Sequence, residues 1–168
     1  MKVETYKLKD WEDLESGLLI AENEEWILVK NIPIDYIVDG YSIYKKEFIE
    51  SRTPAQKAVL IERVLELKKI DEKSPDLFAF SDTIGLLKWV EDRYGIFEFQ
   101  DDIEDELFYG KINSIVGDRL IIDMIKSDGS VEIKFDFEFE ISKIRVITFE
   151  TDYHSSVRLL WNDEMKNK

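Results

Sequence analysis

The sequence predicts a mainly β fold with helices, an α+β fold of two small, bent, five-stranded barrels joined by a helical linker. Three observations lead to this prediction. Residues Val131 to Ile141 alternate apolar and polar without interruption, which is typical of a strand with one buried face. Two blocks of the chain each carry about five short apolar runs within roughly 50 residues, joined by short turns. Helical patterns fill the segment between these blocks.

The composition suits a folded domain in water. Of 168 residues, 44% are hydrophobic and 12% aromatic, which is enough for a packed core. No apolar run approaches the roughly 18 residues of a membrane span, and the first residues lack the apolar segment of a secretory signal. The absence of cysteine excludes disulfides, thiolate metal sites and cysteine nucleophiles. We therefore expect a cytoplasmic protein.

The charge is strongly acidic. Lys and Arg number 23 against 37 Asp and Glu, a formal net charge of −14. Phosphate backbones repel such a chain unless its basic residues gather locally, and the longest basic runs are only the pairs Lys45-Lys46 and Lys68-Lys69. We interpret the acidity first as a source of solubility. The sharper alternative is a mimic of nucleic acid or a binder of a basic partner.

The first predicted barrel covers residues 1–52. It begins with a strand-like run at Val3 to Leu8. The apolar runs Gly17 to Ala21 and Trp26 to Val29 flank a polar turn and predict a hairpin. A further strand is predicted at Tyr41 to Tyr44, directly after a turn signal.

Residues 53–80 are predicted to form a helix and a linker. In Thr53-Pro54-Ala55-Gln56 the threonine can cap, the proline suits the first helical position, and the glutamine completes a capping box. An apolar stripe continues to about Lys69. The polar run Asp71 to Pro75 ends the helix and is the best candidate linker.

The second predicted barrel, residues 81–168, has a leading helix and a C-terminal helix. Ser81 or Asp82 can cap a helix that reaches Tyr94, and Gly95 suits the left-handed position after it. The strands are predicted at Ile96 to Phe99, Leu107 to Ile115, Leu120 to Ile125, Val131 to Phe139 and Ile144 to Phe149. The tail from about Ser155 to Met165 predicts a short helix that buries Val157, Leu160 and Trp161.

The two blocks also match each other in pattern. Gly17 and Gly110 each begin a strand, 93 positions apart. The next apolar runs, Ile27-Leu28-Val29 and Leu120-Ile121-Ile122, and the pairs Glu47-Phe48 and Glu140-Ile141 fall at the same offset. Three matches at one offset predict an internal repeat that arose by duplication.

The strand order, with the short turn Glu140 to Ser142 before the last strand, resembles that of Sm-like barrels. The helix Ser81 to Tyr94 lies where Sm-like proteins carry their N-terminal helix. Phe108 to Ile112, with Ile141 to Phe149 and Tyr153, also resembles a set of uncharacterised bacterial proteins. The resemblance covers most of the second half and, loosely, the first. It implies tandem Sm-like barrels, and it carries over no catalytic role to residues of this chain.

No motif points to an enzyme. His154, the only histidine, excludes any site that needs two, and beside Tyr153 at the start of a short helix it is expected to be a capping or surface residue. The chain has no nucleophile elbow and no glycine-rich phosphate loop. The acidic turn Asp101 to Glu106 lacks the ligand spacing and glycine of a calcium loop. Acids are too abundant for any pair to indicate a hydrolase. We expect no catalytic residue, cofactor or metal.

Six residues are candidates for partner binding. Trp89 falls away from the apolar face of its helix, so it either packs between barrels or marks a surface for a partner. The tyrosines and lysines around the Asp39-Gly40 turn could stack on RNA bases, although neighbouring acids disfavour this. The six candidates are Tyr36, Tyr41, Tyr44, Lys45, Lys46 and Trp89.

The favoured function is a non-enzymatic protein-binding or scaffolding module, which a protein partner reaches through an edge strand or the Trp89 surface. The alternative is RNA binding through the aromatic and basic loop. It requires a local positive patch on a chain whose net charge opposes it.

Overall fold

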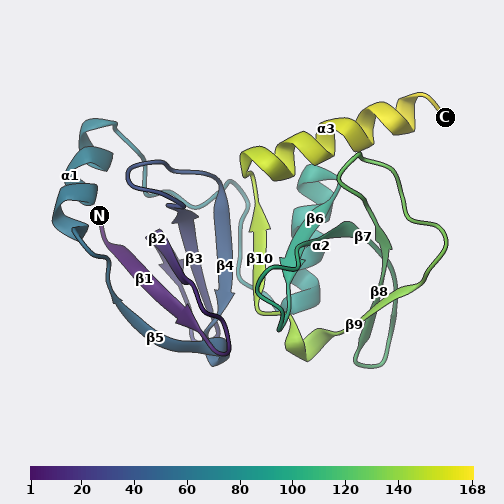
Figure 1. Ribbon diagram of the computed structural model, residues 1–168, viewed down its shortest axis with the longest axis horizontal. Coiled ribbons are helices and arrows are strands. Elements are labelled where there is room, and N and C mark those ends of the chain that lie inside the picture. Colours follow the sequence, from purple (N-terminus) through teal and green to yellow (C-terminus); the bar gives the residue numbers. More distant parts are fainter. The chain divides into compact units, whose positions relative to one another are not determined.

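The computed structural model describes all 168 residues, which form two compact units, residues 1–80 and 81–168 (Figure 1). Each unit contains five antiparallel strands. The first also holds the helix α1 (Ala58–Leu67), and the second holds α2 (Thr83–Tyr94) and α3 (Asp152–Lys166). The predicted mainly β, α+β class is therefore confirmed. No helix has the length and apolarity needed to cross a membrane.

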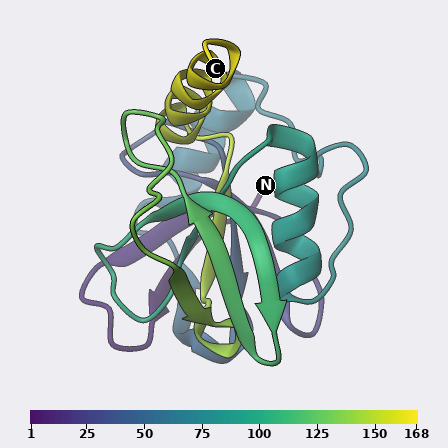
Figure 2. The same ribbon diagram turned by 90° about the vertical axis from the view of Figure 1, so that its right-hand side faces the viewer.

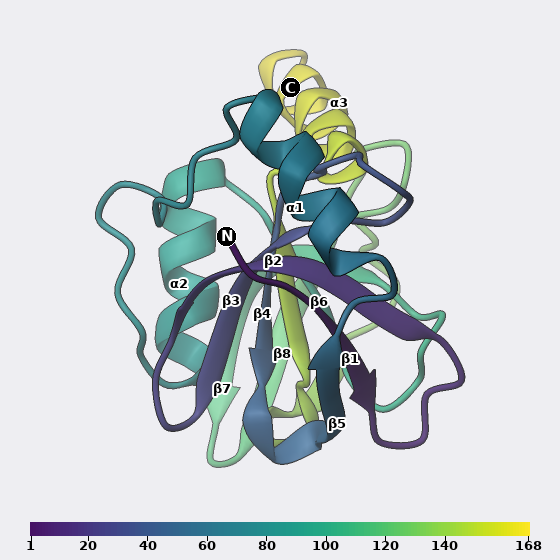
Figure 3. The same ribbon diagram turned by 90° about the vertical axis from the view of Figure 1, so that its left-hand side faces the viewer.

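The strands of the first unit follow the order β5-β1-β2-β3-β4 (Figure 3). They are β1 (Val3–Leu8), β2 (Leu14–Glu22), β3 (Trp26–Asn31), β4 (Tyr41–Lys45) and β5 (Ile49–Pro54). A short 3₁₀ helix, η1 (Lys46–Phe48), joins β4 to β5, the first and last strands of that order. So short a link can connect the two ends only if the sheet curls strongly. The end strands do not pair with each other, so the sheet is not closed.

The second unit repeats this arrangement in the order β10-β6-β7-β8-β9 (Figure 2). Its strands are β6 (Phe97–Gln100), β7 (Phe108–Val116), β8 (Arg119–Met124), β9 (Phe137–Glu140) and β10 (Val146–Phe149). The 3₁₀ helix η2 (Ile141–Lys143) joins β9 to β10, as η1 joins β4 to β5.

The hairpins β2–β3 and β7–β8 have the same register. Gly17 faces Asn31 and Gly110 faces Met124, so both partners are displaced by 93 positions. The register of each hairpin also shifts once at equivalent places, between Leu19 and Ala21 and between Ile112 and Ser114. The two hairpins therefore have the same residue pairs, displaced by 93 positions, and the same shift of register.

Beyond these hairpins, matching residues of the two units are no longer 93 positions apart. Tyr44 faces Ile27 across β4 and β3, and Phe139 faces Leu120 across β9 and β8. The two aromatic residues lie 95 positions apart, as do η1 and η2. The second unit therefore has two additional residues between β8 and β9. The predicted match of Glu47-Phe48 with Glu140-Ile141 is wrong by two positions.

The helix predicted to begin at Thr53-Pro54 begins later. Thr53 and Pro54 end β5, where they face Thr5 and Glu4 of β1, and α1 starts at Ala58. Pairing with β1 therefore overrides the local capping signal, and proline is tolerated because β5 is an edge strand. The buried Leu65 of α1 packs with the core residues Val3, Leu18, Ile32 and Ala55.

The predicted bounds of the second helix are confirmed. The Asp82 carboxylate accepts a hydrogen bond of 2.7 Å from the Gly85 amide, and Gly95 ends the helix with φ of 87°. The final helix, α3, is capped instead by Thr151, whose hydroxyl accepts from the His154 amide at 3.0 Å. Leu160, predicted to be buried on this helix, is 47% exposed.

The predicted strand from Val131 to Ile141 forms only in its second half. Phe137 faces Ile122, and this register, if continued, would set Val131 opposite Asp128, beyond the end of β8. Val131 instead pairs with Ile125 after a tight turn. The four residues 133–136 are consequently extruded from the ladder between these two pairings.

Candidate functional site

The open edge of β9 is the first candidate site. β9 is the end strand of its sheet and pairs only with β8. The Ile141 amide donates to the Asp118 carbonyl at 3.0 Å, which identifies the hydrogen-bonded pairs of this ladder. Because such pairs alternate along an antiparallel strand, the backbone groups of Glu138 and Glu140 are directed to the open side. Unpaired groups of this kind can accept a further strand.

Large apolar side chains protrude beside this edge. Ile133 is 88% exposed and Phe135 is 68% exposed, although the alternating pattern predicted both for the core. The Phe135 ring contacts that of Phe137, with 6.3 Å between the centroids. Phe139, by contrast, is buried, and its ring lies 4.6 Å from that of Phe108. Apolar side chains grouped in water beside an open strand edge are typical of a protein contact surface.

The same region is acidic. The segment 131–140 contains four carboxylates and one lysine, and Asp136 has no partner within the chain. Arg119 lies 3.6 Å from carboxylate oxygens of both Glu138 and Glu140, and the Lys143 ammonium lies 3.6 Å from Glu140, so these two cations compensate only part of this charge. The field around the β9 edge therefore favours a basic partner.

The three tyrosines proposed from the sequence do not form one surface within the first unit. Tyr44 is 1% exposed, and its ring lies 5.2 Å from that of Tyr6 in the core of the first unit. Tyr41 is half-buried, with the Lys30 ammonium 5.6 Å from its ring centroid. Tyr36 lies elsewhere, at the wall of a surface hollow. The tyrosine cluster that the sequence suggests is thus divided between core and surface.

The two candidate lysines are held by carboxylates. The Lys45 ammonium lies 2.6 Å from Glu47, and the Lys46 ammonium lies 2.6 Å from Glu22. Both pairs are partly exposed, so each contributes little stability, but each cancels a positive charge. The loop around these lysines consequently lacks the uncompensated basic charge that a phosphate backbone attracts.

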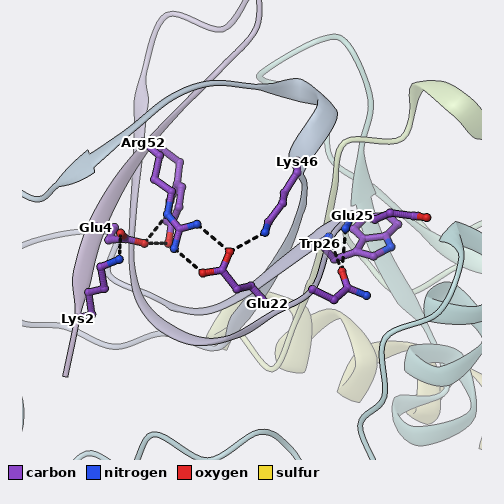
Figure 4. A network of polar contacts seen from close by, with 9 residues as sticks. Lys2, Glu4, Glu22, Glu25, Trp26, Lys46 and Arg52 are labelled. Carbon is purple, nitrogen blue, oxygen red and sulfur yellow. Dashed lines mark hydrogen bonds and ion pairs between the residues drawn. The ribbon is translucent and has the colours of Figure 1, made fainter.

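Lys46 belongs to an ion network that joins β1, β2, β5 and η1 (Figure 4). Arg52 forms a two-pronged contact with Glu22 at 2.9 and 3.0 Å, and its Nε donates to Glu4 at 2.8 Å. The Lys2 ammonium and the Tyr6 hydroxyl also reach Glu4, at 2.8 and 2.9 Å. Each donor of the network therefore finds a carboxylate, and the network binds the edge strand β5 to its neighbours.

This network shifts the pKa values of its acids. Burial raises the pKa of Glu4, but the hydrogen bonds from Lys2, Tyr6 and Arg52 outweigh it and hold that pKa below its ordinary value. Hydrogen bonds from Arg52 and Lys46 lower the pKa of Glu22 to about 2. Both acids are therefore ionised at neutral pH and act as structural anions.

Trp89 is half-buried against its own unit. Its ring lies 5.3 Å from that of Phe149 and 6.2 Å from that of Tyr94, both at steep angles. The Arg93 guanidinium lies 5.7 Å from the Trp89 centroid, which covers the ring further. These contacts give the indole a packing role within residues 81–168.

His154 is buried, which corrects the expectation of a surface or capping residue. Its Nε2 lies 3.1 Å from the Ile96 carbonyl, and its ring packs edge-on against Tyr94. Burial lowers the pKa of His154, because the charged imidazolium would lose its hydration. No three His, Asp or Glu side chains are arranged to hold a metal ion.

The sequence missed the exposed pair Ile133 and Phe135, because alternation alone assigned them to the core. A signal was present in the turn Ser127-Asp128-Gly129, whose position limits how far β9 can pair along β8.

Comparison of the chain with protein-family models, with curated proteins and with solved structures found no match.

Proposed function

We propose that the chain is a tandem of two Sm-like small barrels that arose by duplication of one unit. Three features support this proposal: the common strand order, the 3₁₀ link between the end strands, and the hairpin registers displaced by 93 positions. Gly17 and Gly110 occupy the same position in these registers. If the two units had arisen independently, their hairpins would have no reason to share the same shift of register at the same place.

We further propose that the protein is a non-enzymatic protein-binding or scaffolding module whose partner adds a strand to β9. The observation that carries this proposal is the exposure of Ile133 and Phe135 beside a strand with an unpaired edge. Strand addition supplies backbone hydrogen bonds, and the exposed apolar side chains supply contact area and register.

The charge of the edge specifies the partner further. Asp136, Glu138 and Glu140 flank the open side, and Arg119 and Lys143 compensate them only in part. The partner segment is therefore an extended strand in which apolar residues alternate with lysine or arginine. RNA binding through the Tyr36–Lys46 loop has less support, because Tyr44 is buried and both lysines are paired with carboxylates.

A defined peptide tests this proposal. We expect saturable binding of an eight-residue peptide of alternating valine and lysine, measured by fluorescence anisotropy, and much weaker binding of the valine–glutamate equivalent. Affinity should fall as salt rises, because exposed charges are screened. Equal binding of the two peptides would contradict the proposal.

Variants locate the site. Glu138→Pro removes an outward-facing amide while leaving the bonds to β8, so affinity should fall about threefold to tenfold. Phe135→Ser should weaken binding similarly through lost apolar contact. The matched control is Leu159→Ser on α3, another exposed apolar position of the same unit, which should bind as the wild type does. If neither β9-region variant changes the affinity of the basic peptide, its site is elsewhere and the proposal fails.

A further inference from the structure

A surface hollow of about 340 Å³ lies in the first unit, whereas β9 belongs to the second. Its wall is built from β1, β2, the loop before β4 and the segment that leads into α1. This volume is at the lower end of the range of small-molecule sites in proteins. The hollow therefore has room for a ligand with few non-hydrogen atoms.

The floor of the hollow is apolar with one polar pair. Ile32 and Ala55 are buried there, at 4% and 8% exposure, and the half-buried Ile61 lies beside them. The Thr5 and Ser16 hydroxyls, 3.2 Å apart, share one hydrogen bond and keep further capacity to donate or accept. Such a floor suits a short aliphatic group with a polar group at one end.

Two opposite charges line the same hollow. Asp35 and Lys57 both contribute to its wall, yet neither side chain has an ion pair or hydrogen bond within the chain. Because they form no ion pair with each other, their charged atoms are more than 4.0 Å apart. A carboxylate and an ammonium are thus both available to a molecule in the hollow.

The backbone at both residues is unusual. Asp35 has φ of 45° and Lys57 has φ of 61°, the left-handed region that residues other than glycine rarely adopt. Lys57 also directly precedes α1 and makes no side-chain cap. Backbone strain of this kind is found more often where side chains are positioned for a ligand.

We propose that this hollow binds a small zwitterion with an apolar side chain, of the class of the free aliphatic α-amino acids. The ligand carboxylate contacts the Lys57 ammonium and the ligand ammonium contacts the Asp35 carboxylate, both as charge-assisted hydrogen bonds. The aliphatic side chain occupies the floor formed by Ile32, Ala55 and Ile61. A simple anion would be repelled by Asp35, and a simple cation by Lys57, so both charges of the ligand are needed.

This site goes beyond the proposed partner binding and is independent of it, because the hollow and β9 belong to different units. It gives the first unit a ligand-binding role of its own. Failure of either proposal leaves the other intact.

Three probes that share one aliphatic group test the site. L-Leucine carries both charges, 4-methylpentanoate lacks the ammonium, and 3-methylbutylamine lacks the carboxylate. We expect L-leucine to bind the full-length protein about tenfold more tightly than either analogue, measured by titration of backbone amide NMR signals. The signals that move should be those of the hollow, including Asp35 and Lys57.

Charge-removing variants assign each contact. Lys57→Gln should weaken L-leucine binding about fivefold or more and leave 3-methylbutylamine unaffected or bound more tightly, because the repelling ammonium is gone. Asp35→Asn should weaken L-leucine binding and leave 4-methylpentanoate unaffected or bound more tightly, and asparagine tolerates the left-handed backbone. Lys7→Gln, a lysine of β1 outside the hollow, is the matched control and should bind L-leucine as the wild type does.

Three outcomes would overturn the proposal. One is the absence of any saturable signal change at millimolar L-leucine. Another is equal affinity for all three probes, which would indicate apolar contact alone. The third is unchanged L-leucine binding in both Lys57→Gln and Asp35→Asn. N-acetyl-leucinamide, which has neither charge, should not bind, and its binding at the affinity of L-leucine would likewise exclude recognition of the zwitterion.

Discussion

Gly17 and Val29 approach each other so closely across β2 and β3 that a Cβ atom on residue 17 would lie 2.6 Å from Val29 Cγ2. Gly110 occupies the equivalent position in the second unit. A Cβ atom there would lie 2.6 Å from the Asp123 carbonyl oxygen and 3.2 Å from Ile122 Cδ1. At this point in both units the facing strands leave no room for a side chain.

Gly17→Ala is therefore expected to destabilise the protein by about 2 kcal/mol, because the added methyl group must displace a packed valine. Gly110→Ala should cost at least as much, since a backbone oxygen cannot rotate aside. Urea unfolding followed by circular dichroism measures both losses. The control is Ser51→Ala at an exposed position of β5, which should stay within about 0.5 kcal/mol of the wild type. If Gly17→Ala leaves the free energy of unfolding unchanged, the two strands must be farther apart at this position.

The extruded segment before β9 predicts a large difference between two phenylalanines. Phe139→Ala should cost about 3–5 kcal/mol, because its buried ring packs between Phe99 and Phe108. Phe135→Ala should cost less than about 1 kcal/mol, because that ring is 68% exposed. Unfolding free energies of the two variants give the comparison directly. Similar losses of unfolding free energy at both positions would mean that Phe135 is also buried, as in the continuous strand that the alternating pattern predicts.

The ion network predicts a specific pH dependence. The pKa of Glu22 is about 2 in the folded protein, below its value in the unfolded chain, so the unfolded state takes up the proton first as the pH falls. The stability that Glu22 contributes is therefore complete above about pH 4.5 and is lost as the pH falls toward about 2. The difference in unfolding free energy between wild type and Glu22→Gln should shrink over this interval.

Exposed acids provide the reference for that experiment. Glu164→Gln on α3 removes an exposed carboxylate that no cation of the chain contacts, so this control should stay within about 0.5 kcal/mol of the wild type at neutral pH. A difference for Glu22→Gln that does not change between pH 4.5 and 2 would show that Arg52 and Lys46 do not hold this carboxylate in solution.

His154 supplies one proton-sensitive NMR signal, because the chain has no other histidine. Burial lowers its pKa from the ordinary 6.5, so the imidazole signal should still be mainly that of the neutral ring at pH 6.5. The unfolded chain binds the proton more readily, and His154 therefore makes the fold less stable as the pH falls below about 6.5. A titration midpoint near 6.5 would instead place the ring in water.

The sequence predicts correctly the strands and helices whose ends depend on neighbouring residues, such as caps and turn glycines. The bounds of β1 and of α2 follow from alternation, from the Asp82 cap and from Gly95. The start of α1 could not be read in this way, because Thr53 and Pro54 pair with β1, nearly 50 residues earlier in the chain. Capping is worth about 1 kcal/mol, which a strand pairing with buried neighbours readily exceeds.

The candidate sites were harder to predict for the same reason. Whether Ile133 and Phe135 are buried depends on the register of β9 against β8, which alternation does not define. The hollow gathers residues from Thr5 to Ile61 that share no motif. The sequence does not show that Tyr6 covers Tyr44, and Tyr44 is therefore predicted to be free to stack on a base.

The pairing of β1 with both β2 and β5 has a consequence for synthesis on the ribosome. β1 emerges before both of its partners and can form a hairpin with β2 as soon as that strand is made, yet its other side has no partner until Pro54 has been made. A nascent chain that pauses before that point presents a half-paired strand to its surroundings. The order of translation thus makes β5 the element that completes the first unit, and codon-dependent pauses within residues 23–54 would prolong the exposure of β1.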